Sequence, residues 1–467
     1  MVFASLEFLL LFFPIFLVLY ALTPTGGKNT TLLLGSWIFY AWWSPPYLLL
    51  LVALTAVTYA GGLWIEKAAV VERRKNILVA LIVALVGILG WYKYANIFVE
   101  SVGTVIGWAG YMPATWNKVV LPIGLSFIVL QAISYLVDVY RGTVKAQQNF
   151  VAFAAYKAMF GQLIAGPIIR YAWVKKEIGH RRFSMDGFCA GAWRFMAGLS
   201  MKVLVADTLA PVVNVAFDQV APTFLDAWVG CGAYTLQLYF DFAGYSAMAI
   251  GIALMLGFHF PENFNHPYQA TSIQDFWRRW HLSLSSWIRD YLYIPLGGSR
   301  GGQWATCRNL ILTMSIAGLW HGGDSWNYLI WGFLHGVALC GARLWAGAGL
   351  RLPMLLSRCL TLLFVMLAWT LFRSHDIEMA GRMYAGQLGL QGFELGDALK
   401  VELRLPHLLA FILAITSITW PVYGVRWLVN ARPRWADTVL LWPLPAFLLS
   451  FALMSSRGAV PFLYFQF

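Results

Sequence analysis

Residues 29–65 contain no charged side chain, and this apolar run constrains the fold of the chain more than any other feature. A helix that crosses the hydrocarbon core of a bilayer needs about 20 apolar residues, so the run is too long for a single crossing. Ser44, Pro45 and Pro46 interrupt it, and proline ends a helix because it lacks an N–H donor. The run therefore predicts a hairpin of two membrane helices.

The composition of the whole chain indicates the same class of protein. Of its 467 residues, 60% are hydrophobic and 12% are charged, whereas soluble domains average about 25% charged residues. The mean hydropathy is +0.66. We expect an all-α, polytopic membrane protein, built as a single membrane-embedded domain over residues 1–467. About 11–13 membrane segments, with re-entrant or interfacial helices, would surround a central tunnel.

Apolar runs along the chain predict where the membrane helices lie. The first residues predict a retained helix, because no basic residue precedes Lys28. Further spans are expected near residues 77–92, 119–139, 191–215, 226–258, 307–320, 325–346, 355–373, 407–430 and 437–455. Residues 150–182 and 259–306 fit no regular span. Irregular backbone at membrane depth needs surrounding protein or water, so re-entrant or interfacial helices are expected there.

The charge and cysteine content exclude several other classes of protein. The 33 basic and 21 acidic residues give a net charge of +12. In a membrane protein this excess is explained by basic cytoplasmic loops beside anionic membrane lipid, so no nucleic-acid partner is expected. The basic loop at residues 66–76 is accordingly placed in the cytoplasm. The five cysteines show no CxxC spacing, which predicts neither a disulfide framework nor a zinc site.

One stretch concentrates charge within this apolar chain: QDFWRRWHLSLSSWIRDYLYIPLGG, residues 274–298. On a helix, Asp275 and Arg279 would be four residues apart and could neutralise each other, with Arg278 nearby. That pairing gives the charges a purely structural explanation. It leaves unexplained His281, which lies between a tryptophan and several serines.

The chain has eight histidines, and most are expected to be structural or solvated. His321 differs because it follows an apolar run in GLWHGGDSWNYLIWGFLHG, where an ionisable side chain is costly. On a continuous helix, His335 would lie about 21 Å from His321, too far to share a metal ion or a proton. The HxxxH and HExxH patterns are absent, so no metal site is expected.

Several long motifs together resemble a known family. They are LPIGLSFIVLQAISYLVDVYRG, QLIAGPIIRY, SIQDFWRRWHLSLSSWIRDYLYIPLGGSR and GLWHGGDSWNYLIWGFLHG, in this order over residues 119–346. This motif-bearing core resembles the membrane-bound O-acyltransferases, in the bacterial branch that acts in alginate and cellulose O-acetylation and in teichoic-acid D-alanylation. The stretch DFAGYSAMAIG departs from the branch, because Ala243 and Ala247 replace a serine and an acid.

The resemblance implies both a site and a reaction. The family's near-universal histidine falls on His321, and its second motif position falls on His281. The donor would be cytoplasmic acetyl-CoA, used as a substrate with no permanently bound cofactor. The acetyl group would go to an exported polysaccharide of the alginate or cellulose type. The implied partners are periplasmic SGNH-like acetylation proteins and a polysaccharide synthesis and export complex, at the bacterial inner membrane.

The residues themselves suit acyl transfer. Moving an acetyl group from a thioester to a hydroxyl needs a base and stabilisation of the oxyanion. A buried neutral histidine can take the proton, and we assign this role to His321. His281 would orient the acceptor, hydrogen-bond the thioester carbonyl or assist proton transfer. An acyl-enzyme on Ser283 or Ser285 is an alternative to direct transfer, although neither lies in a GxSxG motif.

No phosphate-binding glycine loop is present, so arginine and lysine side chains would have to bind the phosphates of the donor. The candidates are Arg278, Arg279 and Arg170, with Lys175 and Lys176. Anchoring at the cytoplasmic surface explains these residues equally well. Two other classes of function share the composition: a polytopic transporter or flippase, and a scaffold of an exopolysaccharide export complex. A donor-dependent activity would distinguish an acyltransferase from both.

Overall fold

The computed structural model describes residues 1–108, 116–164, 166–419, 442–458 and 460–463. All regular structure in these residues is helical, which confirms the all-α prediction. The chain forms two compact units. Unit 1 comprises Met1–Phe195 and Met248–Pro261, and unit 2 comprises Met196–Ala247 and Glu262–Phe467. The single domain and the central tunnel expected from the sequence stay predictions.

Several helices have the length and composition of membrane spans, which confirms a multi-pass membrane protein. In the described residues, six meet both criteria: Pro45–Lys67, Val71–Gly107, Met185–Phe217, Phe224–Met255, Asn327–Gly347 and Met354–Arg373. Glu7–Leu22, Leu125–Tyr140 and Leu405–Thr419 are shorter apolar helices. The spans expected near residues 407–430 and 437–455 fall partly on residues 420–441, which lie outside the described residues.

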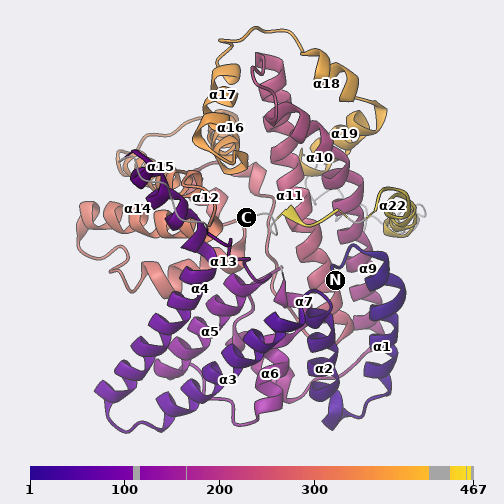
Figure 1. Cartoon of the computed structure of the whole chain (residues 1–467), viewed down its shortest axis with the longest axis vertical. Helices are drawn as coiled ribbons and strands as arrows, with labels where there is room; N and C mark the ends of the chain where they lie inside the picture. Colours follow the sequence, from indigo (N-terminus) through magenta and orange to yellow (C-terminus); the bar gives the residue numbers. More distant parts are fainter. Residues whose placement is uncertain (109–115, 165, 420–441, 459, 464–467) are drawn as a thin grey trace. The chain divides into compact units, whose positions relative to one another are not determined.

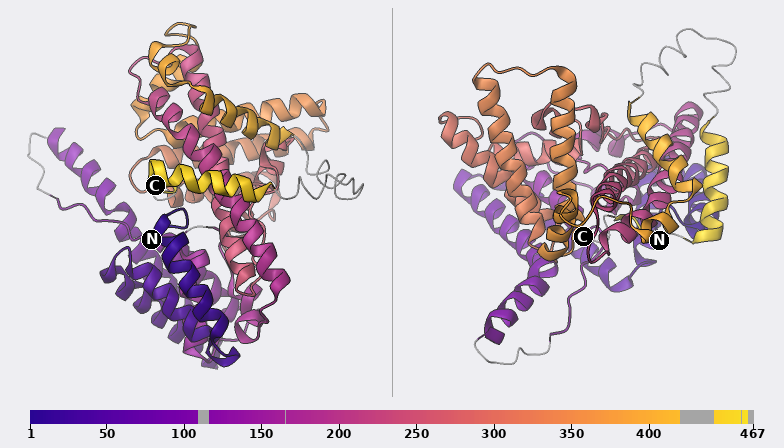
Figure 2. Two further views of the ribbon diagram at one scale, coloured as in Figure 1. Left: turned by 90° about the vertical axis from the view of Figure 1, so that its right-hand side faces the viewer. Right: turned by 90° about the horizontal axis from the view of Figure 1, so that it is seen from above.

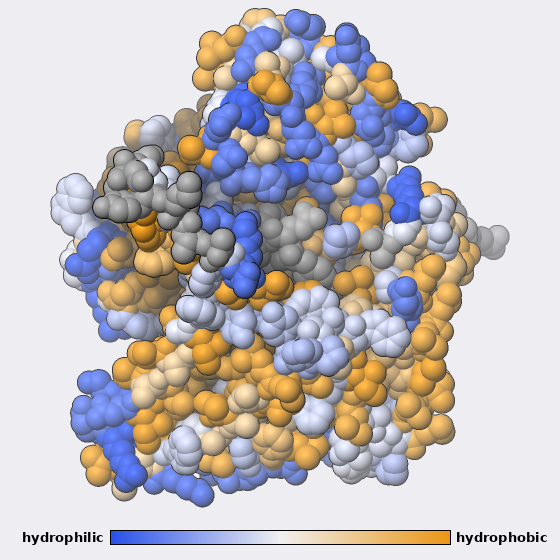
Figure 3. Space-filling model, viewed as in Figure 1, coloured by the Kyte–Doolittle hydropathy of each residue, from blue (hydrophilic) through white to orange (hydrophobic). Residues whose placement is uncertain are grey.

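Unit 1 contains the amino-terminal helices (Figure 1). They are η1 (Glu7–Phe12), α1 (Phe13–Leu22), η2 (Thr25–Gly27), α2 (Lys28–Ala41), α3 (Pro45–Lys67), α4 (Val71–Trp108), α5 (Leu125–Tyr140), α6 (Phe150–Ala158), α7 (Phe160–Leu163), α8 (Tyr171–Gly179) and most of α9 (Met185–Ser200). Helix α2 ends at Ala41 and Pro45 begins α3, which confirms two helices separated at the prolines; of the two, α3 is one of the six candidate spans. Hydrophobic side chains make up most of the lower face in Figure 3, as expected for a surface that contacts lipid.

Helix α4 is the longest element of unit 1. Its 38 residues correspond to about 57 Å at the rise of an α-helix, against about 30 Å for the hydrocarbon core. The distal part of α4 stands away from the other helices of unit 1 (Figure 2). There Phe98 and Val105 expose 67% and 59% of their surface.

The irregular character predicted for residues 150–182 is confirmed. This segment breaks into the short helices α6, α7 and α8. Gly166 has a φ of +111°, and a Cβ there would lie 2.9 Å from the Cβ of Ala249. Only glycine fits this turn, because the left-handed conformation and the close neighbour both exclude a side chain.

Unit 2 contains the remaining helices and the second irregular segment (Figure 1). Its helices are η3 (Met201–Ala206), α10 (Asp207–Phe217), most of α11 (Phe224–Met255), η4 (Pro267–Gln269), α12 (Ile273–Trp277), α13 (Leu282–Ile288), η5 (Arg289–Tyr293), α14 (Gly302–His321), α15 (Asn327–Gly347), α16 (Met354–Arg373), α17 (Ile377–Gln387), α18 (Asp397–Glu402), α19 (Leu405–Thr419) and α22 (Pro443–Arg457). The short helices between residues 267 and 293 confirm that this part of 259–306 is no regular span.

Helices α14 and α15 form an antiparallel hairpin with a very close contact. A Cβ added to Gly332 would lie 2.2 Å from the carbonyl oxygen of Met314, and one added to Gly336 would lie 2.7 Å from Cα of Ile311. Gly332 and Gly336 form a GxxxG pattern, which lets two membrane helices approach backbone to backbone. These glycines therefore set the position of α14 and of His321 at its end.

We expect Gly332→Ala to destabilise the protein, because the atom that the new Cβ meets is backbone and cannot rotate away. Overpacking of this kind costs about 1–3 kcal/mol. Gly341→Ala on the same helix is the matched control, since no atom lies within 4 Å of a Cβ there. Thermal unfolding of the detergent-solubilised variants measures the effect. Equal melting temperatures for both variants would contradict the glycine contact.

Candidate active site

His321 is the last residue of α14, in unit 2. The residue exposes 6% of its surface. Its imidazole is surrounded by aromatic rings, with centroid separations of 4.9 Å to Trp320, 5.3 Å to Trp331 and 5.4 Å to Phe372. The side chain therefore lies among aromatic rings at the carboxyl-terminal end of α14.

His335 lies closer to His321 than a continuous helix would allow. The separation of about 21 Å applies only to a continuous helix, and the chain breaks between the two predicted spans: α14 ends at His321 and α15 begins at Asn327. The hairpin places Trp331 between the two histidines, with its ring 5.3 Å from that of His321 and 4.7 Å from that of His335. The glycines and the aspartate of HGGDS are typical turn residues, in agreement with the predicted break between residues 320 and 325.

His335 itself is fully buried and hydrogen-bonded. The indole Nε1 of Trp277 donates to its Nδ1 across 3.2 Å. An acceptor at Nδ1 fixes the neutral tautomer that carries its proton on Nε2. Trp277 belongs to the charged, tryptophan-rich stretch, so this bond ties that stretch to α15 in unit 2.

His281 has an unusual backbone conformation as well as a buried side chain. Its φ is +45°, and within the described residues His266 is the only other non-glycine residue with a positive φ. His281 exposes 1% of its surface, and its ring lies 4.6 Å from that of Phe242. Burial lowers the pKa of His281 to about 3. Left-handed conformations of non-glycine residues concentrate at functional sites, because the surrounding structure has to hold them in place.

Asn263 provides part of that support, and the sequence did not single it out. Its Oδ1 accepts hydrogen bonds from the backbone N–H and the hydroxyl of Ser283, at 3.2 and 2.9 Å. Its carbonyl oxygen accepts from the N–H of Leu282 at 2.9 Å, and its Nδ2 donates to Ser246 Oγ at 3.1 Å. Asn263 thus joins the start of α13 to α11 and fixes the backbone that follows His281.

A series of aromatic contacts connects the surroundings of the two predicted catalytic histidines. The ring of Trp280, the residue before His281, lies 5.1 Å from that of Trp369. Trp369 lies 5.8 Å from Trp331, which contacts His321. Both histidines therefore belong to one aromatic core of unit 2. A direct meeting of the two imidazoles stays a prediction.

The ion pair predicted between Asp275 and Arg279 is confirmed, and a second pair joins Arg289 and Asp290. Arg279 Nε donates to Asp275 Oδ1 across 2.8 Å, four residues apart. Arg289 Nε donates to Asp290 Oδ1 across 2.7 Å. These ion pairs neutralise charge locally, while Arg278 is exposed. They therefore account for much of the charge that the sequence concentrates here.

Arg170, the remaining arginine proposed for the donor, belongs to unit 1. The residue exposes 9% of its surface, and its guanidinium carbon lies 5.0 Å from the ring centroid of Trp173. This geometry is that of a cation–π contact. Arg170 thus lies in a more buried and more aromatic environment than Arg278.

Comparisons with known proteins cover most of the chain. Residues 143–372 match the MBOAT, membrane-bound O-acyltransferase, family. The "Probable alginate O-acetylase AlgI" of Azotobacter vinelandii is 46% identical over 91% of this chain and 85% of that protein. The "Peptidoglycan O-acetyltransferase" of Helicobacter pylori is 34% identical over 83% of this chain and 80% of that protein.

A more distant relative is the "Teichoic acid D-alanyltransferase" of Bacillus subtilis, 27% identical over 46% of this chain and 58% of that protein. The family match contains both His281 and His321. The similarity to the Azotobacter protein extends far beyond these motifs, over 428 residues. The resemblance seen in the sequence is therefore confirmed, and the chain belongs to the membrane-bound O-acyltransferase family as a multi-pass O-acyltransferase.

Proposed function

We propose that this protein moves an acetyl group from cytoplasmic acetyl-CoA across the bacterial inner membrane for O-acetylation of an exported polysaccharide of the alginate type. The observation that carries the proposal is the 46% identity to an alginate O-acetylase over 91% of the chain. The Helicobacter relative, a peptidoglycan O-acetyltransferase, supports an acetyl group and a carbohydrate acceptor.

His321 is the general base of the proposed reaction. Its imidazole takes the proton of the acceptor hydroxyl while the hydroxyl oxygen attacks the thioester carbonyl carbon. The new C–O bond forms, the C–S bond breaks, and the proton passes to the leaving thiolate of CoA. This role requires a neutral imidazole before the reaction, because the neutral form is the one that accepts a proton; three aromatic rings surround it.

His281 acts as a neutral hydrogen-bonding group rather than as a cation. Its lowered pKa keeps the imidazole uncharged at physiological pH. A neutral imidazole can donate from one nitrogen and accept at the other, so it can orient the acceptor or bind the thioester carbonyl. The hydroxyl of Ser283 donates to Asn263 Oδ1 and that of Ser285 to the carbonyl oxygen of Trp280. These bonds favour direct transfer over an acyl-serine.

The proposed donor and partners follow from the same assignment. Arg278 is exposed and could contact the donor phosphates, whereas Arg279 already pairs with Asp275. Arg170, beside Trp173 in unit 1, is the other candidate for the donor. Delivery of the acetyl group would involve periplasmic SGNH-like acetylation proteins and the polysaccharide synthesis and export complex, beside anionic lipid of the inner membrane.

We expect His321→Ala to reduce acetyl-CoA-dependent turnover by at least about 100-fold, because a general base contributes about 10²- to 10⁴-fold. Purified protein in nanodiscs with radiolabelled acetyl-CoA measures this loss. His375→Ala is the matched control, since His375 is exposed in the same unit. Both variants should keep the melting temperature of the wild type within a few degrees. Full turnover in a folded His321→Ala protein would refute the role of this base.

We expect His281→Asn to reduce the loss of stability in acid. The folded state binds a proton at His281 only near pH 3, whereas an unfolded histidine binds one near pH 6.5. The unfolded state therefore binds more protons below pH 6.5, and folding stability falls as the pH falls. Between pH 7 and pH 5, the free energy of unfolding falls by about 2 kcal/mol through His281 alone.

Asparagine tolerates the left-handed backbone at this position and does not titrate. Melting temperatures of wild type and His281→Asn at pH 7 and pH 5 provide the comparison. The melting temperature of the variant should fall less between pH 7 and pH 5 than that of the wild type. An identical drop in both proteins would show that His281 is protonated in the folded state or contributes nothing to the acid sensitivity.

A further inference from the structure

Unit 2 contains two adjoining polar cavities that the proposed reaction does not yet use. The outer cavity has a volume of about 480 Å³ and the inner cavity about 90 Å³. Asp207, Ala210, Asn214 and Val460 line both, so the inner cavity continues the outer one. The outer volume falls within the roughly 300–1,000 Å³ that is typical of small-molecule sites.

A buried ion cluster forms one wall of the inner cavity. Lys202 Nζ lies 2.5 Å from Asp207 Oδ1 and 2.9 Å from Asp241 Oδ1, and the lysine side chain is 2% exposed. The π-helical turn η3 places Lys202 and Asp207 on one face, because i and i+5 are neighbours in such a turn. Charges at membrane depth are costly and mark functional sites by default.

Gln237 gives a second and independent indication of a ligand. It lies one helical turn before Asp241 on α11, is 6% exposed and lines the same inner cavity. Its Oε1 accepts no hydrogen bond from the described part of the chain. A buried acceptor without a donor is unfavourable, so a group that donates a hydrogen bond is expected to occupy the inner cavity.

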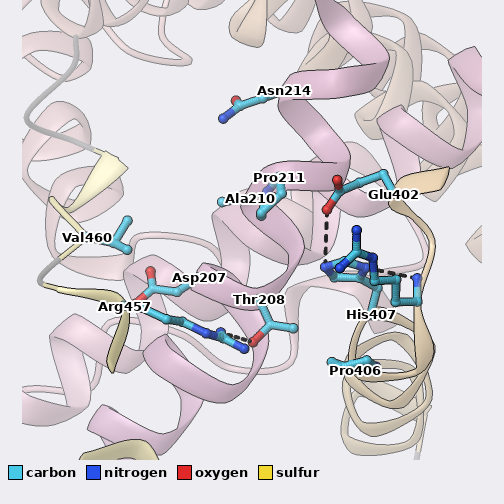
Figure 4. A pocket seen from close by; sticks show the side chains of 11 residues that line it. Asp207, Thr208, Ala210, Pro211, Asn214, Glu402, Pro406, His407, Arg457 and Val460 are labelled. Carbon is cyan, nitrogen blue, oxygen red and sulfur yellow. Dashed lines mark hydrogen bonds and ion pairs between the residues drawn. The ribbon is translucent and has the colours of Figure 1, made fainter. Parts of the chain in front are cut away.

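The outer cavity offers both hydrogen-bond donors and acceptors (Figure 4). Glu402 Oε1 lies 3.5 Å from His407 Nε2, and Arg457 Nη1 donates to Thr208 Oγ1 across 3.2 Å. The charged residues of this cavity balance in sign: Asp207 and Glu402 are acidic, and Arg404 and Arg457 are basic. A lining of this kind suits a ligand with many hydroxyl groups, since each hydroxyl both donates and accepts.

The cavities lie towards the non-cytoplasmic end of a membrane span. The span Met185–Phe217 follows directly after Arg181 and Arg182, which the positive-inside rule places in the cytoplasm. Helix α10, which lines both cavities, is the last part of this span. A ligand from outside the cytoplasm can therefore reach the outer cavity.

Successive residues of α11 line the inner cavity and contact His281 within unit 2. Asp241 lines the cavity, and the next residue, Phe242, has its ring 4.6 Å from that of His281. The ring of Tyr245, one turn after Asp241, lies 4.7 Å from that of Phe462. Helix α11 thus presents Asp241 to the cavity and Phe242 to His281.

We propose that this pair of cavities is the acceptor subsite: the outer cavity holds a sugar residue, and the inner cavity receives a hydroxyl that donates to Gln237. This assignment rests on the proposed function, and it identifies the acceptor as a carbohydrate bound by charge-balanced polar groups. It also gives the polar helix in DFAGYSAMAIG a role in binding the acceptor.

The test measures acceptor binding and donor turnover separately in the full-length protein in nanodiscs. Calorimetric titration with alginate oligosaccharides gives the Kd, and hydrolysis of radiolabelled acetyl-CoA gives donor turnover. Ala210→Trp should raise the Kd at least tenfold by filling the passage between the cavities. Gln237→Leu should raise the Kd about five- to thirtyfold, because it removes the side-chain oxygen that accepts the hydrogen bond and keeps a side chain of similar volume.

Leu409→Trp is the matched control, because Leu409 is 55% exposed on α19 and lines neither cavity. An unchanged Kd in folded Gln237→Leu would overturn the acceptor subsite, and so would a wild type that does not bind the oligosaccharides. In both cases the cavities hold structural water only. If the wild-type protein did not turn over acetyl-CoA at all, the proposed function would be overturned. A raised Kd in the variants would still support the subsite in that case.

Discussion

A polar group inside the hydrocarbon core has to be satisfied by the protein itself, and the structure follows from this constraint. Long apolar helices satisfy their own backbone, so they need no particular partner. The short helices of unit 2 leave many backbone N–H and C=O groups at their ends, and side chains form hydrogen bonds with some of these groups. Asn263, which bonds the start of α13 and Ser246 of α11, is the clearest example. The backbone conformation of His281 depends on such bonds.

The parts of the fold set by composition could be predicted from the sequence. The apolar run at residues 29–65 and its prolines predicted a hairpin, because length and helix breaking decide such a structure locally. The irregular segments could also be located, since glycine, proline and charge interrupt apolar runs there. The ion pair between Asp275 and Arg279 follows from spacing on one helix.

Features that depend on contacts between distant residues could not be predicted. The spans predicted near residues 307–320 and 325–346 located the break between α14 and α15, but not the packing of the two helices against each other. The close approach of these helices at Gly332 places Trp331 between the two histidines. The hydrogen bonds of Asn263 and the burial of Gln237 also arise from tertiary packing. No pattern of neighbouring residues indicates them.

The proposed reaction uses two imidazoles that both belong to the aromatic core of unit 2. A double-mutant cycle on turnover by the purified protein tests most directly whether they act in one step. Residues that act as a unit are not additive, so the variant that combines His321→Ala with His281→Asn should be no slower than the slower single variant. Fully additive losses in the double variant would contradict the account, because they would show that the two histidines act independently.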